Sequence, residues 1–363
     1  MDIIARAAPL LIGLLLFGAL IVIHEFGHFI AARGCGVAVL EFAVGMGKKL
    51  FGFKIGETEY SLRALPIGGF CKMLGEDENS PDDRAFTNKS VIKRMIIILA
   101  GAFMNMVLAV VMFALVMAFT GFGSSVIDTV AEGSPAQKAG ILPGDEILRI
   151  NGAKTRMFDL VSFEISSSGG EAVDIVIKRD SGKVTKTVTP VFDKNENKYV
   201  IGVMTVSKNG VFSKRYGATD AITVFESVSA GFWQMEYLVK LTFSALGGLF
   251  TRKTPVSDLS GPIYIVGVIG ESYNAVVKYG AFQVIIMLME FMGMLSASIG
   301  LFNILPLPGL DGGRFAFLAL EAARRKPLPP EKEGMVHFVG LALLVALGIF
   351  VAYHDVLKII SGK

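Results

Sequence analysis

The stretch that decides the fold is residues 10–34, which read LLIGLLLFGALIVIHEFGHFIAARG. The apolar run extends from Ala8 to about Ile23, and its helical pattern continues to Ala32. A helix needs roughly 17–25 apolar residues to cross the hydrocarbon core of a membrane. Arg6 before the run would also suit a signal peptide, but no convincing cleavage site follows it. We therefore expect a membrane-spanning helix.

The composition of the whole chain favours a membrane protein. Hydrophobic residues make up 52% of the 363 residues, charged residues only 18%, and the mean hydropathy is +0.57. Such a chain is too hydrophobic for intrinsic disorder, and ordinary soluble domains carry about 25% charged residues. The net charge of +3 is too small for a nucleic-acid-binding surface. We expect the lipid bilayer as a partner and no nucleic acid.

Three further apolar runs have the length of membrane spans, namely Met95–Phe119, Phe282–Leu305 and Val336–Tyr353. Ten basic residues lie between the first two spans, and five lie between the last two. Because short cytoplasmic loops are enriched in Lys and Arg, we place both connections in the cytoplasm and both termini outside. The predicted fold class is an α-helical polytopic membrane protein with four transmembrane helices, two in residues 1–120 and two in 281–363.

The long segment between the second and third spans contains a compact α/β module. Strand-like stretches are 147–150, 173–178, 184–190 and 199–203, and a helical stretch spans 158–168. The turns and apolar positions of GSPA (133–136), AGI (139–141), GD (144–145) and ING (150–152) resemble a bacterial protease-associated PDZ domain. The resemblance implies an extracytoplasmic PDZ domain at 121–207, which binds extended peptide at a sheet edge. An unrelated β-rich spacer is the alternative.

Residues 208–280 are predicted to form an amphipathic helix and a connector. Apolar residues recur at mostly three- to four-residue spacing between Gly217 and Phe250, interrupted by charged and amide side chains. Trp233 and Tyr237 suit the depth of the outer membrane interface. A fifth span is the alternative, but it would leave the basic loop after the third span outside.

His24, Glu25 and His28 form the pattern H-E-x-x-H at the end of the first span. Residues four apart share one face of a helix, so both imidazoles can bind one Zn²⁺. Glu25 is then placed to take a proton from a water molecule at the metal. Helix-packing histidines are the alternative, but ionisable side chains in an apolar span cost roughly 2–3 kcal/mol each and indicate function.

A catalytic zinc site needs a third protein ligand. His337 and His354 are candidates by residue type, but Asp311, in NILPLPGLDGG at 303–313, fits better. The first and third of four spans cross in the same direction, so Asp311 and the histidines end on the same membrane face. A helix N-cap is the alternative role for Asp311.

Together these features resemble the site-2 protease family of intramembrane zinc metalloproteases, and within it the bacterial regulator-of-sigma-E protease branch. The resemblance covers essentially the whole chain, with one PDZ domain where several relatives carry two. Its motifs are the HEFGH pattern, ALPIGGF at 64–70, LSGPI at 259–263 and NILPLPGLDGG. It implies that His24, His28 and Asp311 bind one Zn²⁺ per chain and that Glu25 is the catalytic acid and base. It also implies that Asn303, Pro306 and Pro308 position the substrate.

The resemblance further implies a location and a reaction. The location is the bacterial plasma (inner) membrane, with the active site toward the cytoplasm. The reaction is cleavage of the transmembrane segments of single-pass proteins, such as anti-sigma factors or remnant signal peptides. A first cut by a site-1-type protease is expected to precede it. A membrane metal or ion carrier and a non-catalytic PDZ scaffold are the competing functions.

The connection at residues 34–92 is predicted to dip into the membrane as a β-like loop. Thr58–Arg63 alternates in the manner of a strand. An edge there could hold an unwound substrate by backbone pairing, and we expect substrate contacts from Arg63, Leu65, Gly68 and Gly69. A plain cytoplasmic loop is the alternative.

Overall fold

The computed structural model describes residues 2–76, 80–180, 182–212, 221–251, 261–326 and 330–361. It divides into two units, Met1–Ala109 with Ala245–Lys363, and Val110–Ser244. Residues 259–260 of the LSGPI motif lie outside the described residues.

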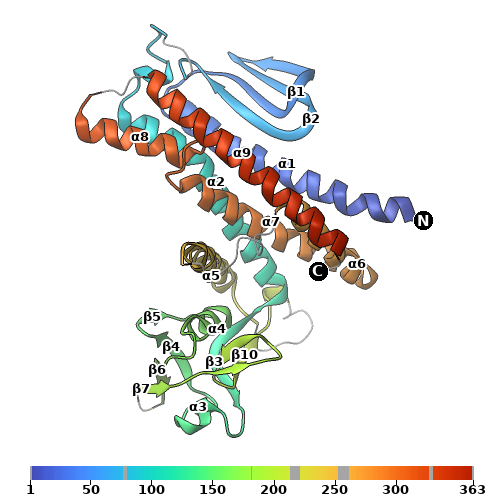
Figure 1. Ribbon diagram of the computed structural model, residues 1–363, viewed down its shortest axis with the longest axis vertical. Helices are drawn as coiled ribbons and strands as arrows, with labels where there is room; N and C mark the ends of the chain where they lie inside the picture. The colour runs from blue at the N-terminus through green and yellow to red at the C-terminus, as the bar shows by residue number, and fades with distance from the viewer. Residues whose placement is uncertain are drawn as a thin grey trace. The chain divides into compact units, whose positions relative to one another are not determined.

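The first unit is built from long helices (Figure 1). Its helices are α1 (Asp2–Gly34), α2 (Val91–Thr120, shared with the second unit), α6 (Pro262–Val276), α7 (Ala281–Ile304), α8 (Asp311–Arg324) and α9 (Pro330–Ser361), with short 3-10 turns at Phe86–Asn88 and Val277–Tyr279. Helix α1 contacts α6 and α7, and α6 also contacts α9. Among the described helices, four are long and apolar enough to cross a membrane: Leu11–Gly34, Val91–Thr120, Ala281–Ile304 and Lys332–Lys358. The prediction of four long apolar helices is confirmed.

Helix α9 exposes apolar side chains along its length, as a helix in contact with lipid does. Leu343, Val345 and Ile349 are each more than half exposed, and no charged residue lies among them. A soluble monomer rarely exposes so large a continuous apolar surface. The exposed face of α9 is therefore suited to contact with acyl chains.

Helices α1 and α2 approach each other closely at two glycines. A β-carbon at Gly27 would lie 2.3 Å from the carbonyl oxygen of Ala100. One at Gly101 would lie 2.4 Å from Nε2 of His28. Small residues at a helix crossing let backbones come close, and here they bring α2 against the histidine face of α1.

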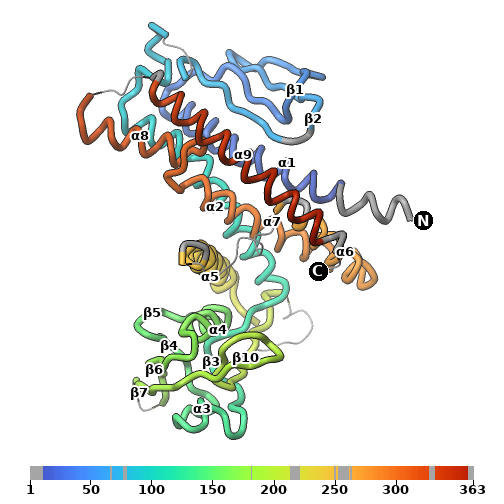
Figure 2. The backbone as a smooth tube through the Cα atoms, in the orientation of Figure 1, coloured from blue at the N-terminus to red at the C-terminus, as the bar shows by residue number. Residues whose placement is uncertain are grey.

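The connection after α1 is a curled antiparallel sheet of two long strands, β1 (Val39–Ile55) and β2 (Thr58–Met73). Figure 2 shows the backbone tube of both strands beside α1. Phe42 of β1 and Tyr60 of β2 pack with Phe29 of α1 at ring-centroid distances of 5.4–6.3 Å. This aromatic cluster joins the sheet to the first span.

The two strands pair with each other twice along their length, and this pairing sets which part of β2 lies at an edge of the sheet. Tyr60 pairs with both Phe42 and Phe53, and the whole stretch 59–62 has a paired neighbour on each side. Cys71 pairs only with Phe42 among the described residues. The expectation of a strand at 58–63 is confirmed, but its assignment as a free edge is wrong, because β1 folds back and covers both sides. The two outer strands of this sheet are 69–73 and 51–55, and 69–73 is the one whose residues line the metal cleft described below.

The second unit contains a β-sheet and α5 (Val224–Phe250). The sheet runs in the order β10-β3-β4-β6-β7, with β5 beside β4 and a separate β8–β9 hairpin. The strands are β3 (Phe122–Val130), β4 (Glu146–Ile150), β5 (Ala153–Lys154), β6 (Val173–Arg179), β7 (Gly182–Val188), β8 (Val191–Asp193), β9 (Lys198–Val200) and β10 (Val203–Lys208), with helices α3 (Pro135–Lys138) and α4 (Phe158–Ser167). The apolar face of this sheet packs on Val161 and Ile165 of α4.

Most of the predicted strands of this unit are present. The stretches 147–150 and 173–178 match β4 and β6, and 158–168 matches α4. The stretch 184–190 runs two residues past the end of β7, and 199–203 is divided between β9 and β10 by a break at Gly202, where φ is +78°. Strand β3 was not predicted. Helix α5 lies within the predicted amphipathic stretch and is not among the four span-length apolar helices described.

A buried ion pair stabilises the second unit. The Asp145 carboxylate has 1% of its surface exposed and accepts two hydrogen bonds of 2.7 Å from the Arg179 guanidinium. These bonds hold the pKa of Asp145 below its usual range, although burial acts in the opposite direction. A depressed pKa means that this stabilisation is present above about pH 4 and is lost as the pH falls through the folded-state value.

Arg179→Met should therefore leave a buried carboxylate without its partner. We expect the free energy of opening of β4, measured by hydrogen exchange on the full chain in detergent at pH 7, to fall by about 2 kcal/mol. The control is Lys178→Met, which removes the exposed pair with Glu146 at 3.6 Å and should cost less than about 1 kcal/mol. Equal effects of the two substitutions would contradict the role of the buried pair.

Candidate metal centre

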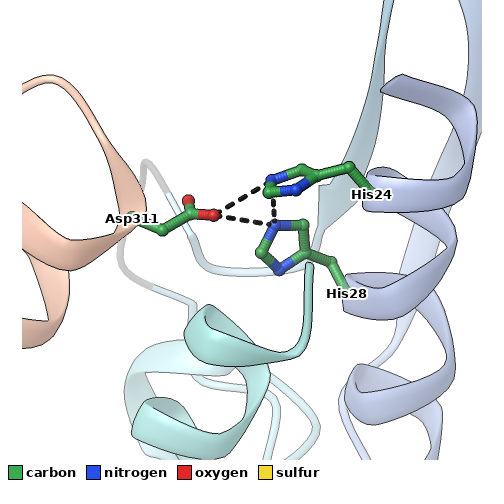
Figure 3. Close-up of side chains that lie close together, drawn as sticks. All are labelled: His24, His28 and Asp311. Atoms are coloured by element: carbon green, nitrogen blue, oxygen red, sulfur yellow. Dashed lines mark hydrogen bonds and ion pairs between the residues drawn. The ribbon is translucent and has the colours of Figure 1, made fainter. Parts of the chain in front are cut away.

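Three side chains from distant parts of the chain meet in the first unit (Figure 3). His24 and His28 project from α1, and Asp311 is the first residue of α8. Oδ2 of Asp311 lies 3.0 Å from Nε2 of His24 and 3.3 Å from Nε2 of His28, and the two Nε2 atoms are 3.2 Å apart. Both imidazoles are buried, and the carboxylate side chain is 21% exposed.

The spacing of these three atoms fits a tetrahedral cation. Zinc binds imidazole nitrogen and carboxylate oxygen at about 2.0–2.1 Å, which puts neighbouring ligand atoms of a tetrahedron about 3.3 Å apart. The observed separations of 3.0–3.3 Å match that value. Two imidazoles and one carboxylate with a fourth position left open are the donor set of a catalytic zinc site.

The protonation of His28 agrees with this geometry. Its Nδ1 lies 2.8 Å from the backbone carbonyl oxygen of Ile97 in α2. Because a carbonyl oxygen only accepts, Nδ1 must carry the proton. The lone pair of neutral His28 is therefore on Nε2, the atom that faces Asp311.

Close backbone packing positions Asp311. The link between α7 and α8 contains Pro306 and Pro308 and turns at Gly309, whose φ is +95°. A β-carbon at Gly312 would lie 2.2 Å from the carbonyl oxygen of Leu305. The start of α8 can therefore fold back on the end of α7 only with glycine at this position. The N-cap of α8 is Leu310, and Asp311 does not serve as the cap.

A polar cleft of about 590 Å³ opens onto the cluster. Glu25 lies in its wall, and Oε2 of Glu25 accepts a hydrogen bond of 3.0 Å from the backbone N–H of Cys71. The lining residues are His24, Glu25, His28, Glu41, Arg63, Phe70, Cys71, Lys72, Met73, Glu76, Ile98, Asp311 and Arg314. The cleft therefore joins the three ligand side chains to residues of the β1–β2 sheet.

Of the predicted substrate residues, Arg63 lines this cleft and Gly69 lies next to it. The guanidinium of Arg63 donates to Glu41 at 2.7 Å and stacks over Phe70, both of which line the cleft. A β-carbon at Gly69 would lie 3.6 Å from Cγ of Glu25. Gly68 instead faces the side chain of Met46.

Other predicted substrate residues are not in the cleft lining. Leu65 is 57% exposed. The Asn303 amide donates to Ile299 of its own helix at 3.0 Å. Pro306 is exposed, and Pro308 contacts Gly340 of α9.

The two remaining histidines are separate from the cluster. Nδ1 of His337 accepts a hydrogen bond from Gly309 N–H at 3.0 Å. His354 lies near the end of α9, where its ring packs on Phe350. Among the described residues, His24, His28 and Asp311 form the group of potential metal ligands.

Sequence reasoning missed the contribution of α2. Ile97, Gly101 and Asn105 lie four residues apart on one face of this helix, and all three contact the histidines. Asn105 was visible as a polar residue in an apolar run, but nothing in the sequence indicated what it faced.

A family model described as "Peptidase family M50" matches residues 12–347. The chain belongs to peptidase family M50. The matched range contains both histidines and Asp311, and the membership identifies the chain as a peptidase. Family M50 is the site-2 protease family that the sequence motifs indicate.

Curated relatives in M50 match along almost the entire chain. A protein of Clostridium acetobutylicum described as a candidate zinc metalloprotease is 38% identical, over 96% of this chain and 97% of its own length. The zinc metalloprotease RasP of Geobacillus kaustophilus is 30% identical, over 95% and 97% of the two chains. The regulator of sigma-W protease RasP of Bacillus subtilis is 29% identical, with the same coverage.

Proposed function

We propose that this M50 peptidase is a zinc-dependent intramembrane endopeptidase that cleaves the transmembrane segments of single-pass membrane proteins. The convergence of His24, His28 and Asp311 at tetrahedral spacing, on or beside membrane-length helices, carries the proposal. The names of the relatives support zinc as the metal. Bound zinc would polarise the scissile carbonyl and lower the pKa of a water molecule.

Glu25 is the proposed general base and acid. It follows His24 in the chain, and its carboxylate lines the same cleft as the three ligand side chains. In this position it can accept a proton from the attacking water and deliver it to the leaving amine. The N–H of Cys71 holds its Oε2 atom at the cleft wall.

The sheet edge at residues 69–73 is the proposed binding site for the unwound substrate. Cys71 donates its N–H away from β1 and toward Glu25, so this edge faces the cleft. A transmembrane helix hides its carbonyl groups in internal hydrogen bonds, and pairing with a strand edge would replace those bonds after unwinding. The peptide would then lie beside the metal ligands in an extended form.

Cys71→Pro tests this edge because proline removes the one outward N–H that holds Glu25 here and that a paired substrate strand would use. Loss of cleavage is expected from either role, so the decisive outcome is normal cleavage, which would contradict both. Proline is tolerated on edge strands where the missing N–H points away from the sheet. We expect cleavage to fall at least tenfold while the zinc content stays unchanged. Cys71→Ala keeps the N–H and should cleave normally. Normal cleavage by the proline variant in a detergent assay would exclude strand addition at this residue.

Residues 121–207, which include the sheet of the second unit, are proposed to be an extracytoplasmic PDZ domain that filters substrates. The order of its strands and helices after the GSPA turn supports this assignment, and β10 ends the described sheet with an edge to which a peptide could add. The filter would exclude proteins with bulky outside domains, or recognise an end left by a site-1-type protease.

Deleting residues 124–206 tests the filter. Gly123 and Ser207 are paired neighbours in β3 and β10, so the two cut ends can be joined without a long linker. We expect the deleted protein to cleave substrates with large outside domains that the full chain rejects. The measurement is cleavage of a matched reporter pair, with and without such a domain. Loss of all cleavage in a folded, zinc-loaded deletion protein would argue against a filter.

The proposed orientation follows the distribution of basic residues. Both termini and the PDZ domain lie outside the plasma membrane of a bacterium, and the metal cleft opens toward the cytoplasm. The bilayer and single-pass proteins, such as anti-sigma factors or remnant signal peptides, are the proposed partners.

Cleavage of a defined single-pass reporter by the purified protein tests the proposed function. We expect new chain ends inside the apolar segment of the reporter, mapped by mass spectrometry. A chelator should stop this cleavage and added zinc should restore it. Zinc-loaded protein that cleaves no single-pass reporter, but moves zinc across liposome membranes, would establish a carrier instead.

A further inference from the structure

The face of α2 that packs on the histidines contains one polar side chain, Asn105, which is neither a metal ligand nor a proton donor or acceptor in the proposed reaction. Asn105 is fully buried, and its Nδ2 atom lies 3.3 Å from Nδ1 of His24. Within the described part of the chain, its Oδ1 atom is buried and has no hydrogen-bond partner. An unsatisfied buried amide oxygen is uncommon and requires an explanation.

The orientation of His24 shows which amide atom is needed at this place. Nε2 of His24 points at Oδ2 of Asp311 and Nε2 of His28, so a metal would bind His24 through Nε2. A neutral imidazole that binds through Nε2 carries its proton on Nδ1 and needs an acceptor there. An amide N–H at this position would instead favour the proton on Nε2, inside the ligand cluster.

A half-turn of the Asn105 amide removes this conflict. The rotation exchanges Nδ2 and Oδ1, which have nearly the same size, and places Oδ1 against Nδ1 of His24. We propose that Asn105 is a positioning residue whose amide oxygen accepts the Nδ1 proton of His24 and so directs the Nε2 lone pair to the metal. This inference rests on the proposed zinc site.

The neighbours of Asn105 fix its position. Its backbone carbonyl accepts a hydrogen bond of 2.8 Å from Ser296 of α7, and Ser296 is fully buried. Gly300, one turn further along α7, approaches so closely that a β-carbon there would lie 3.3 Å from Cβ of Asn105. Helix α7 therefore holds Asn105 through both a hydrogen bond and close packing.

The two ligand histidines then have equivalent supports from one helix. Ile97 offers its backbone carbonyl to Nδ1 of His28, and eight residues later Asn105 offers its side-chain oxygen to Nδ1 of His24. Gly101, halfway between them, leaves room for both rings. Acceptors of this kind fix the tautomer and orientation of metal-binding histidines and raise their basicity.

The test compares Asn105→Leu with Asn105→Asp in the full chain. Leucine has nearly the same size but no acceptor, whereas aspartate keeps an oxygen at the same place. The zinc dissociation constant is measured by competition with a chromophoric chelator, and loss of a supporting acceptor typically weakens metal binding by about 10–100-fold. We expect a weakening in this range for leucine and restoration to within about threefold of the wild-type value for aspartate.

A second measurement separates positioning from packing. ¹⁵N chemical shifts of the histidine rings in zinc-free protein report which nitrogen carries the proton. We expect His24 to be protonated on Nδ1 in the wild type and to lose that preference in Asn105→Leu. Should Asn105→Leu fail to fold, Asn105→Met removes the same acceptor with a more adaptable side chain.

The outcomes distinguish this inference from the proposed function. Wild-type zinc affinity in the leucine or methionine variant, or equal losses in leucine and aspartate variants, would overturn the role of Asn105 while leaving the zinc site intact. Failure of the wild-type protein to bind zinc would instead overturn the proposed function.

Discussion

Glu25→Gln is expected to reduce intramembrane cleavage by about 10²–10⁴-fold while zinc stays bound. Glutamine keeps the shape of the side chain and can still face the N–H of Cys71 through its amide oxygen. It has no carboxylate, however, so it can neither accept the proton of the attacking water nor pass it to the leaving amine. The measurement compares single-turnover cleavage of a single-pass reporter by the two proteins at equal zinc content.

The same substitution can also identify the natural substrate. In membranes that contain only the Glu25→Gln variant, a small single-pass protein should accumulate that the wild type removes. Glu59→Gln is the control, because Glu59 is a carboxylate on β2 that pairs with Lys49 and does not line the cleft. Unchanged cleavage by Glu25→Gln would show that another group transfers the proton.

Gly101→Ala should produce the second large effect, a loss of both zinc binding and cleavage. The added β-carbon would lie 2.4 Å from Nε2 of His28 and 2.8 Å from Nε2 of His24, so neither ring could keep its place. Alanine favours a helix by up to about 1 kcal/mol over glycine, so no loss of helix α2 is expected from propensity. Zinc content and cleavage are measured on the detergent-purified variant.

Gly348→Ala is the matched control for this prediction. It makes the same substitution inside the apolar span of α9, where no described atom lies within 4 Å of the added carbon. We expect full zinc content and normal cleavage from it. Equal zinc binding by Gly101→Ala and the wild type would show that α2 does not press against the metal ligands.

The membrane helices and the histidine pair could be predicted from the sequence because both obey local rules, and Asp311 could be predicted from the order of the spans. A span must reach across the hydrocarbon core, so its length appears in the hydropathy. His24 and His28 share a helix face through their spacing alone. Asp311 follows from counting spans, and the structure places it beside the histidines at 3.0 and 3.3 Å. Its role as a ligand stays a prediction until the metal is measured.

The β1–β2 sheet could be predicted only in part, because its pairing is not local. Alternation marks Thr58–Arg63 as a strand, but the neighbours of a strand are set by how the rest of the chain folds. Strand β1 carries Lys48, Lys49 and three glycines and lacks clear alternation, so it was not recognised. Because β1 was not predicted, its pairing was unknown, and the position of residues 69–73 at an edge of the sheet could not be predicted either.

The support from α2 could not be predicted for a related reason. The carbonyl of Ile97 has no sequence signal, because every residue has one. Gly101 and Asn105 are visible as breaks in an apolar run. The histidines that they contact, His24 and His28, are more than seventy residues away in the chain. Only the crossing of α1 and α2 shows that these breaks face the two histidines.

The zinc content of the purified protein tests the central claim most directly. We expect close to one zinc per chain in the wild type, a large loss in Asp311→Ala, and no loss in His354→Ala, whose histidine lies outside the cluster and packs on Phe350. Wild-type protein without stoichiometric zinc, or an Asp311→Ala variant that keeps its zinc, would contradict it.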